Sequence, residues 1–280
     1  MLLNPFTYYS PKSLAQAVEL LNKPNCKILS GGTILIANLK MFKKRDIKSP
    51  EHVISLRHIP ELKGITSTKT SIEIGAMTTL DELQKSQDVA NNFPLIKDAC
   101  THIGTTPIRN MATMGGNLTC RFSWTELGSV MIALNAVLKF SSSKGEKIIS
   151  AENYFANQAK DEGILTKIII TKKENLLSAY RRIGKKTLID KPSISLSVAV
   201  ENCNDKLTNC RVVFNTGNGF AQRDTKAENF LNEKKVKDIL IQQAAQNTSA
   251  DIISKNLTDY KQHMCGELLK QALDEIMTCK

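Results

Sequence analysis

Two glycine pairs are the residues of this sequence whose type and spacing most directly indicate chemistry. Gly31-Gly32 lies in the run 30–33, and Gly115-Gly116 lies in the longer run 109–118. Glycine adopts positive φ at little steric cost, so a pair can turn successive backbone N–H groups toward one point. Such a nest suits a phosphate or pyrophosphate, and the Asn117 amide adds a donor and an acceptor beside it. Two such loops predict one extended anionic ligand held by both.

The residues around the first pair indicate how it is positioned. Residues 26–29 form a short apolar run that predicts a buried strand, and an apolar segment that starts at Ile34 follows the glycines. A strand, a glycine turn and then a helix form the arrangement in which phosphate groups commonly settle against backbone amides.

Caps and periodicity predict the other elements of the first half. Ser10-Pro11 opens a first helix, because Ser caps helices and Pro is favoured at the first helical position. Residues 79–82 form a capping box that opens a second helix. A further helix runs from about Pro94 to Ile103 and stops at Gly104, and an apolar helix covers residues 130–136. The expected strands are 53–56, 65–67, 72–75, 137–140, 147–149 and 164–170.

The composition changes near residues 172–175, which we interpret as a domain boundary. Beyond it, alternation over residues 194–200 predicts a half-buried strand, and residues 210–214 predict its partner. The remainder is predicted to be helical and to end in a long helix. We interpret the apolar stripe of that helix as core, formed by Leu257, Tyr260, Met264, Leu268 and Ala272. The chain is thus a mixed α/β part followed by an antiparallel sheet with helices.

Cysteine and histidine usage argues against a metal centre in this chain. The seven scattered cysteines include no Cys-x-x-Cys, and the four histidines include no His-x-x-x-His pair. This pattern also argues against a disulfide framework and indicates the reducing cytoplasm. No apolar run of about 18 residues predicts a transmembrane helix, and the N-terminus lacks the features of a signal peptide. We therefore expect a cytoplasmic protein without a membrane partner.

The net charge of +11 indicates an anionic ligand, an acidic protein partner or nucleic acid, or simply a solvated basic surface. The basic residues cluster within 40–48 and again within 181–186. Aromatic residues make up 5% of the chain, and none is interleaved with the basic run, so a base-stacking surface for nucleic acid is not expected.

Taken together, these stretches resemble the FAD-binding (medium) subunit of the xanthine dehydrogenase and carbon monoxide dehydrogenase family of molybdenum hydroxylases. Residues 27–33 resemble the first flavin loop of that family, and residues 104–118 resemble the second. Residues 164–170 and 179–183 are similar to the end of its FAD domain and the entry to its C-terminal domain. Residues 259–261 resemble its closing helix.

The resemblance implies an α+β fold. A two-subdomain α/β FAD-binding domain of the PCMH type would span residues 1–172, with subdomains at about 1–58 and 59–172. A C-terminal domain, a three-stranded antiparallel sheet with a helical bundle, would span 176–280.

The resemblance also implies an oxidoreductase that acts as the flavoprotein subunit of a complex. Molybdopterin would be carried by a large subunit and [2Fe–2S] clusters by a small subunit. Electrons would pass from those clusters through FAD to NAD⁺ or another acceptor. The flavin would carry the redox chemistry, and no residue of this chain is expected to act as a general acid, base or nucleophile.

By matching position, the resemblance assigns residues to the cofactor. The first loop contributes Ile28, Leu29, Ser30, Gly31, Gly32, Thr33, Ile34 and Leu35, and the second contributes Thr113, Gly115, Gly116 and Asn117. Four further residues are assigned to the cofactor. Ile103 is assigned as an apolar neighbour of the flavin, and Glu126 as an acceptor for a ribityl or ribose hydroxyl. Leu165 is assigned as a backbone contact to the flavin, and Arg181 as a cation near it.

Two positions depart from the family pattern and keep other functions open. Ile34 stands where an acidic or polar residue is usual, and Glu126 stands where Asp is usual, within the atypical run 122–126. These departures keep a flavin-free assembly subunit open as one alternative, and a free-standing NAD(P)H-dependent flavin reductase is a second. Trp124, the sole tryptophan, packs in the core in our preferred interpretation and shields the flavin in the other.

Overall fold

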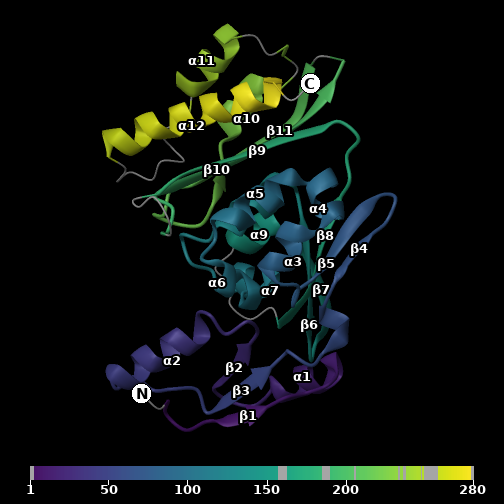
Figure 1. Ribbon diagram of the computed structural model, residues 1–280, viewed down its shortest axis with the longest axis vertical. Coiled ribbons are helices and arrows are strands. Elements are labelled where there is room, and N and C mark those ends of the chain that lie inside the picture. The colour runs from purple at the N-terminus through teal and green to yellow at the C-terminus, as the bar shows by residue number, and fades with distance from the viewer. Residues whose placement is uncertain are drawn as a thin grey trace.

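The computed structural model describes residues 3–156, 163–184, 190–204, 206–232, 234–235, 238–246, 248 and 258–278. In these residues the chain forms three β-sheets. Figure 1 shows their order along the long axis, with the N-terminal sheet at one end, a central sheet, and the C-terminal sheet with the last helices at the other end.

The N-terminal sheet is parallel. It contains β1 (Thr7–Tyr9), β2 (Cys26–Leu29) and β3 (His52–Ser55) in the order β1-β3-β2. Parallel neighbours need crossover connections, which contain α1 (Leu14–Leu20) and α2 (Leu35–Lys44). The strand expected at residues 26–29 is confirmed.

The predicted start of the first helix is wrong. The N-cap is Ser13, whose hydroxyl accepts a hydrogen bond from the Gln16 backbone N–H at 3.3 Å. Pro11 is buried and lies before the helix. The helix therefore begins where a hydroxyl meets the free N–H groups of the first turn, three residues later than the Ser-Pro pair indicated.

The central sheet is antiparallel, in the order β4-β5-β8-β6-β7. Its strands are β4 (Ile65–Ser67), β5 (Ser71–Gly75), β6 (Val137–Ser142), β7 (Gly145–Ser150) and β8 (Ile164–Thr171). The short helix η1 (Pro60–Leu62) precedes it, and the helices around it are α3 (Leu80–Lys85), α4 (Gln87–Asn92), α5 (Pro94–His102), α6 (Thr106–Met111), α7 (Met114–Thr119), α8 (Glu126–Ala133) and α9 (Ala151–Ala156). The strands expected at residues 65–67, 72–75, 137–140 and 147–149 are confirmed, and they pair as two antiparallel hairpins, β4–β5 and β6–β7. The capping box is confirmed too: Thr79 Oγ1 accepts from the Glu82 N–H at 3.2 Å, and Glu82 accepts from the Thr79 N–H at 2.7 Å.

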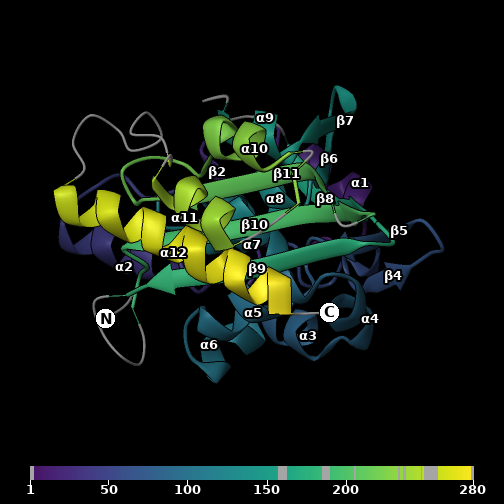
Figure 2. The same ribbon diagram turned by 90° about the horizontal axis from the view of Figure 1, so that it is seen from above.

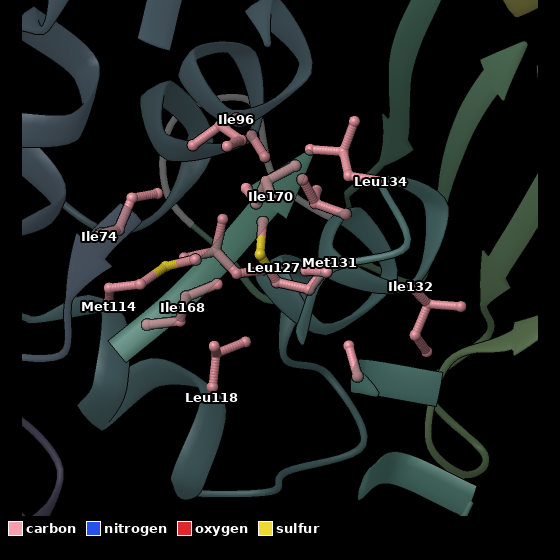
Figure 3. Close-up of a cluster of buried hydrophobic side chains, with 14 of the residues drawn as sticks. Ile74, Ile96, Met114, Leu118, Leu127, Met131, Ile132, Leu134, Ile168 and Ile170 are labelled. Atoms are coloured by element: carbon pink, nitrogen blue, oxygen red, sulfur yellow. The ribbon is translucent and has the colours of Figure 1, made fainter. Parts of the chain in front are cut away.

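Helix α8 is the buried centre of the molecule. Figure 3 shows Leu127 and Met131 of α8 beside Ile168 and Ile170 of β8. On its other side α8 contacts β10 and β11 of the C-terminal sheet, and all its residues are buried. A helix that is apolar all round is stable where packing surrounds it. Helix α7 joins this core through Met114 (Figure 3) and therefore has a fixed position relative to the sheet.

The C-terminal sheet contains β9 (Leu176–Ile183), β10 (Ile194–Cys203), β11 (Lys206–Asn215) and β12 (Gln222–Arg223), antiparallel in the order β12-β11-β10-β9. The two predicted strands exist, and the two-residue β12 adds a fourth to the three that the resemblance implied. The expectation that residues 194–200 are half-buried is wrong: all seven are buried, because β10 packs against both α8 and α12. The helices α10 (Thr225–Leu231), α11 (Asp238–Gln246) and α12 (Asp259–Thr278) lie over one face, as Figure 2 shows. The α+β fold class is confirmed, and the domain limits stay a prediction.

The long closing helix exists, but its predicted stripe is only partly core. Leu268 and Ala272 are buried, whereas Tyr260 is 62% exposed. Tyr260 lies in the first turn of α12, ahead of the buried stretch that begins at Cys265, so the core interpretation is wrong there. Leu257 lies outside the described residues. No helix in the described part of the chain is long and apolar enough to cross a membrane.

Candidate ligand-binding cleft

A cleft of about 1350 Å³ lies where the N-terminal and central parts meet. Its walls come from the β2–α2 connection, α7, the segment between α7 and α8, the β6–β7 hairpin and the segment before β10. Pockets for small ligands usually measure about 300–1,000 Å³, so this cleft has room for an extended ligand.

The structure brings most of the predicted site residues into this one cleft. Its lining includes Ile28, Ser30, Gly31, Gly32, Thr33, Ile34, Leu35, Ile103, Thr113, Gly115, Gly116, Asn117, Glu126 and Leu165. Two predicted residues are not brought into the lining. Leu29 lies in β2, and its carbonyl accepts from the Leu56 N–H at 2.9 Å. The Arg181 guanidinium forms an ion pair with Glu275 of α12.

The first glycine pair combines a special backbone conformation with a close approach. Gly32 has φ of +75°, in the left-handed region that favours glycine. A Cβ on Gly31 would lie 1.9 Å from the Met111 carbonyl oxygen. The first loop thus passes directly under the end of α6, and only a residue without a side chain fits there.

The second glycine pair does not form the nest predicted from the sequence. Gly115 and Gly116 lie in the first turn of α7, and neither has positive φ. A Cβ on Gly115 would lie 2.8 Å from both Cβ and O of Ala76, and one on Gly116 would lie 3.0 Å from Thr113 Oγ1. Glycine is required at these two positions by close packing, of Gly115 against Ala76 at the end of β5 and of Gly116 against Thr113 and Ser30. A left-handed backbone conformation is not the reason.

A hydroxyl pair joins the two loops across the cleft. Ser30 Oγ and Thr113 Oγ1 share a hydrogen bond, and Thr113 Oγ1 also accepts from the Gly116 N–H at 3.0 Å as the cap of α7. Beside them, Asn117 Oδ1 is buried and has no hydrogen-bond partner among the described residues. A buried acceptor left unpaired costs about 1–3 kcal/mol, so a hydrogen-bond donor on a ligand in this cleft would stabilise the site. The residues present therefore fit a dinucleotide, whose hydroxyl and amino groups are such donors.

Glu126 lies at the part of the cleft nearest the C-terminal sheet. Its side chain is buried, and the Tyr180 hydroxyl donates to Oε1 at 2.5 Å. Arg182 Nε lies 3.0 Å from the same oxygen, and Arg182 Nη2 lies 3.0 Å from Asp190 Oδ1. Burial raises the pKa of the Glu126 carboxyl, and the Tyr180 hydrogen bond and the Arg182 charge oppose that rise. The carboxyl is thus held rigidly in the cleft wall, where it can accept from a ligand hydroxyl.

Several residues that line the cleft were not predicted from the sequence. Arg121, Phe122, Tyr154, Asp190, Lys191 and Phe220 all line the cleft. Arg121 and Phe122 follow the matched glycine stretch after Thr119 and Cys120, and this closeness in sequence is the one signal that could have indicated them. Trp124 also lines the cleft and is only partly buried, so its core interpretation is wrong.

The chain matches the family described as FAD binding domain in molybdopterin dehydrogenase over residues 4–172. It is 26% identical to the carbon monoxide dehydrogenase medium chain of Hydrogenophaga pseudoflava, over 96% of both chains. It is also 26% identical to the nicotine 6-hydroxylase medium subunit of Paenarthrobacter nicotinovorans, over 98% of both chains. Its fold matches a chain of the carbon monoxide dehydrogenase structure from Oligotropha carboxidovorans with a TM-score of 0.89 and 26% identity, covering 100% of both chains.

Proposed function

The chain belongs to the family of FAD-binding domains in molybdopterin dehydrogenases, and we propose that it relays electrons within a multi-subunit oxidoreductase of that family. In this proposal it receives electrons from [2Fe–2S] clusters on a small partner subunit and passes them to NAD⁺ or another acceptor. A large partner subunit holds the molybdopterin. Relatives named as medium chains support the division into subunits.

The observation that carries this proposal is the meeting of two glycine loops from different parts of the fold in one cleft. The first loop follows a parallel strand, the second opens α7, and the Ser30–Thr113 hydrogen bond joins them. Glycine in the first loop lets backbone N–H groups approach a diphosphate without intervening side chains. In the second loop the N–H groups of Gly115 and Gly116 donate to Ala76 O and Thr113 Oγ1, so that loop offers the Asn117 side chain instead. This arrangement supports binding of FAD across both loops.

The remaining lining residues have roles that follow from their contacts. Asn117 Oδ1 would accept a hydrogen bond from the cofactor, and Glu126 would accept one from a hydroxyl. Ile103 and Leu165 would contribute apolar wall. Bound FAD supplies the electron-accepting and electron-donating group, and the protein supplies position, charge and exclusion of water.

A reconstitution experiment tests the proposal. The purified chain is incubated with FAD and desalted, and its visible spectrum is recorded. We expect flavin bands that survive desalting; their absence would contradict FAD binding and favour the flavin-free assembly subunit. NADH oxidation by the isolated chain, without co-purifying subunits, would instead indicate a free-standing flavin reductase.

Gly116→Val sharpens this test, because a branched side chain would enter the space beside Thr113 and Ser30. We expect a folded variant that retains little FAD. Gly219→Val is the matched control, since a Cβ at Gly219 would meet no atom within 4 Å. Wild-type FAD retention by a folded Gly116→Val variant would remove the second loop from the binding site.

A further inference from the structure

Arg109 of α6 does not line the cleft, but its side chain bonds to residues that do. Its Nη1 donates to the carbonyl oxygens of Thr101, Ile103 and Gly104, at 3.4, 3.3 and 2.9 Å. Its Nη2 donates to Thr106 Oγ1 at 3.1 Å. The Nε atom is buried and has no partner among the described residues, so the bonds from Nη1 and Nη2 must compensate for burial of the charge. One guanidinium thus joins the end of α5 to the start of α6.

Helix α6 depends on such polar contacts for its position. It has six residues and none of them is buried. A helix of this length is not stable by itself in water, and here no buried side chain fixes it to the core. The Ala112 carbonyl at its C-terminal end accepts from the Leu80 N–H at 2.9 Å. At its N-terminal end the Thr105 cap bond is long, at 3.4 Å, so we assign the main role there to Arg109.

The turn that Arg109 holds is part of the cleft wall. Ile103 and Gly104 both line the cleft, and so does Ile108 of α6. Gly104 has φ of +58°, and a Cβ there would lie 2.8 Å from Ile108 Cγ2, so the turn lies tightly against α6. The planar guanidinium fixes the direction of the carbonyls that it binds, which a single ammonium group does not. Arg109 therefore determines how the backbone of Ile103 is oriented beside the cleft.

We propose that Arg109 is a positioning residue for the bound dinucleotide, because by holding the Ile103 and Gly104 carbonyls it fixes how the Ile103 side chain meets the ligand. This inference rests on the proposed function, since FAD is the ligand whose binding reports it. A guanidinium that merely capped α5 would change the stability of the chain and leave its affinity for FAD as it is. A positioning residue acts through Ile103, so truncation of Ile103 removes its effect on affinity.

A double-mutant cycle with Arg109→Gln and Ile103→Ala tests this inference. The dissociation constant of FAD is measured by fluorescence titration of the purified chain, and denaturation without FAD reports stability separately. We expect Arg109→Gln to weaken FAD binding about tenfold, the size of one hydrogen bond to a charged group. The double variant should bind FAD as Ile103→Ala does, within about twofold. Arg57→Gln, at an exposed arginine after β3, is the matched control and should keep the wild-type affinity.

Two results would overturn the inference while FAD binding itself stood. One is a wild-type affinity for FAD in the folded Arg109→Gln variant. The other is a double variant whose loss equals the product of the two single losses, since Arg109 would then act independently of Ile103. If Arg109→Gln does not fold, Arg109→Lys takes its place in the cycle: it keeps the charge but loses the fork, so we expect a smaller loss with the same dependence on Ile103. Failure of the wild-type chain to bind FAD would instead overturn the proposed function.

Discussion

Gly31-Gly32 leaves a parallel strand and turns the chain through a left-handed residue, whereas Gly115-Gly116 lies in the first turn of a helix with ordinary backbone angles. Both pairs line the same cleft, and both look alike in the sequence. At Gly32 the requirement is conformational, while at Gly31 and Gly115 a Cβ would overlap other atoms, and at Gly116 it would lie in tight contact with Thr113 Oγ1 at 3.0 Å.

This difference predicts different costs for the same substitution. An added methyl group that meets backbone cannot be accommodated by rotating a side chain, so the loops themselves must move. A methyl group on a left-handed residue with space around it costs only the conformational energy. Alanine at each position therefore measures how closely the two loops are packed.

Gly31→Ala should have the largest effect. Its Cβ would overlap the Met111 carbonyl oxygen at 1.9 Å, so the first loop must move away from α6. We expect the free energy of unfolding to fall by about 3 kcal/mol, the upper part of the usual range for overpacking, and FAD binding to be lost. Chemical denaturation and the visible spectrum measure the two effects. A variant with wild-type stability would show that the loops are not in contact.

Gly115→Ala should have an intermediate effect. Contact at 2.8 Å with the Ala76 backbone oxygen costs about 2 kcal/mol as overpacking. Alanine in place of a helical glycine returns about 1 kcal/mol through helix propensity. We expect a net loss of about 1 kcal/mol in denaturation. The double variant Ala76→Gly/Gly115→Ala relieves one of the contacts, and failure to recover any stability would argue that the strain lies elsewhere.

The helix at the second glycine pair shows where sequence reasoning stops. Glycine is a poor helix former, so a Gly-Gly pair favours a loop. Packing of Met114 and Leu118 into the central core overrides this preference. The capping box at Thr79 and the strand at residues 26–29 were predictable, because the residues that determine them are neighbours in the chain.

Strand β9, from which Tyr180 and Arg182 contact Glu126 of the cleft wall, illustrates a second limit. Adjacent residues of a strand point to opposite faces. Arg181 therefore pairs with Glu275 of α12, while Tyr180 and Arg182 meet Glu126 on the other face. If the match between this chain and the family is shifted by one position along β9, the residue assigned to the cofactor moves to the opposite face of the strand. The contact of Lys191 with Trp124 depends on the packing of two distant segments, and no local pattern reports it.

Gly32→Ala should have the smallest effect, and it isolates conformation from packing. A Cβ there would lie 3.2 Å from Leu29 Cδ1, the end of a flexible side chain. The left-handed backbone costs about 1 kcal/mol, and the lower entropy of the unfolded alanine chain returns about 0.5 kcal/mol. We expect a net loss of about 0.5 kcal/mol and retention of FAD. Gly32→Asn should lose less, since asparagine tolerates positive φ. If both variants lost FAD as completely as Gly31→Ala, the two glycines would share one requirement, and the distinction between conformation and close approach in the first loop would not hold.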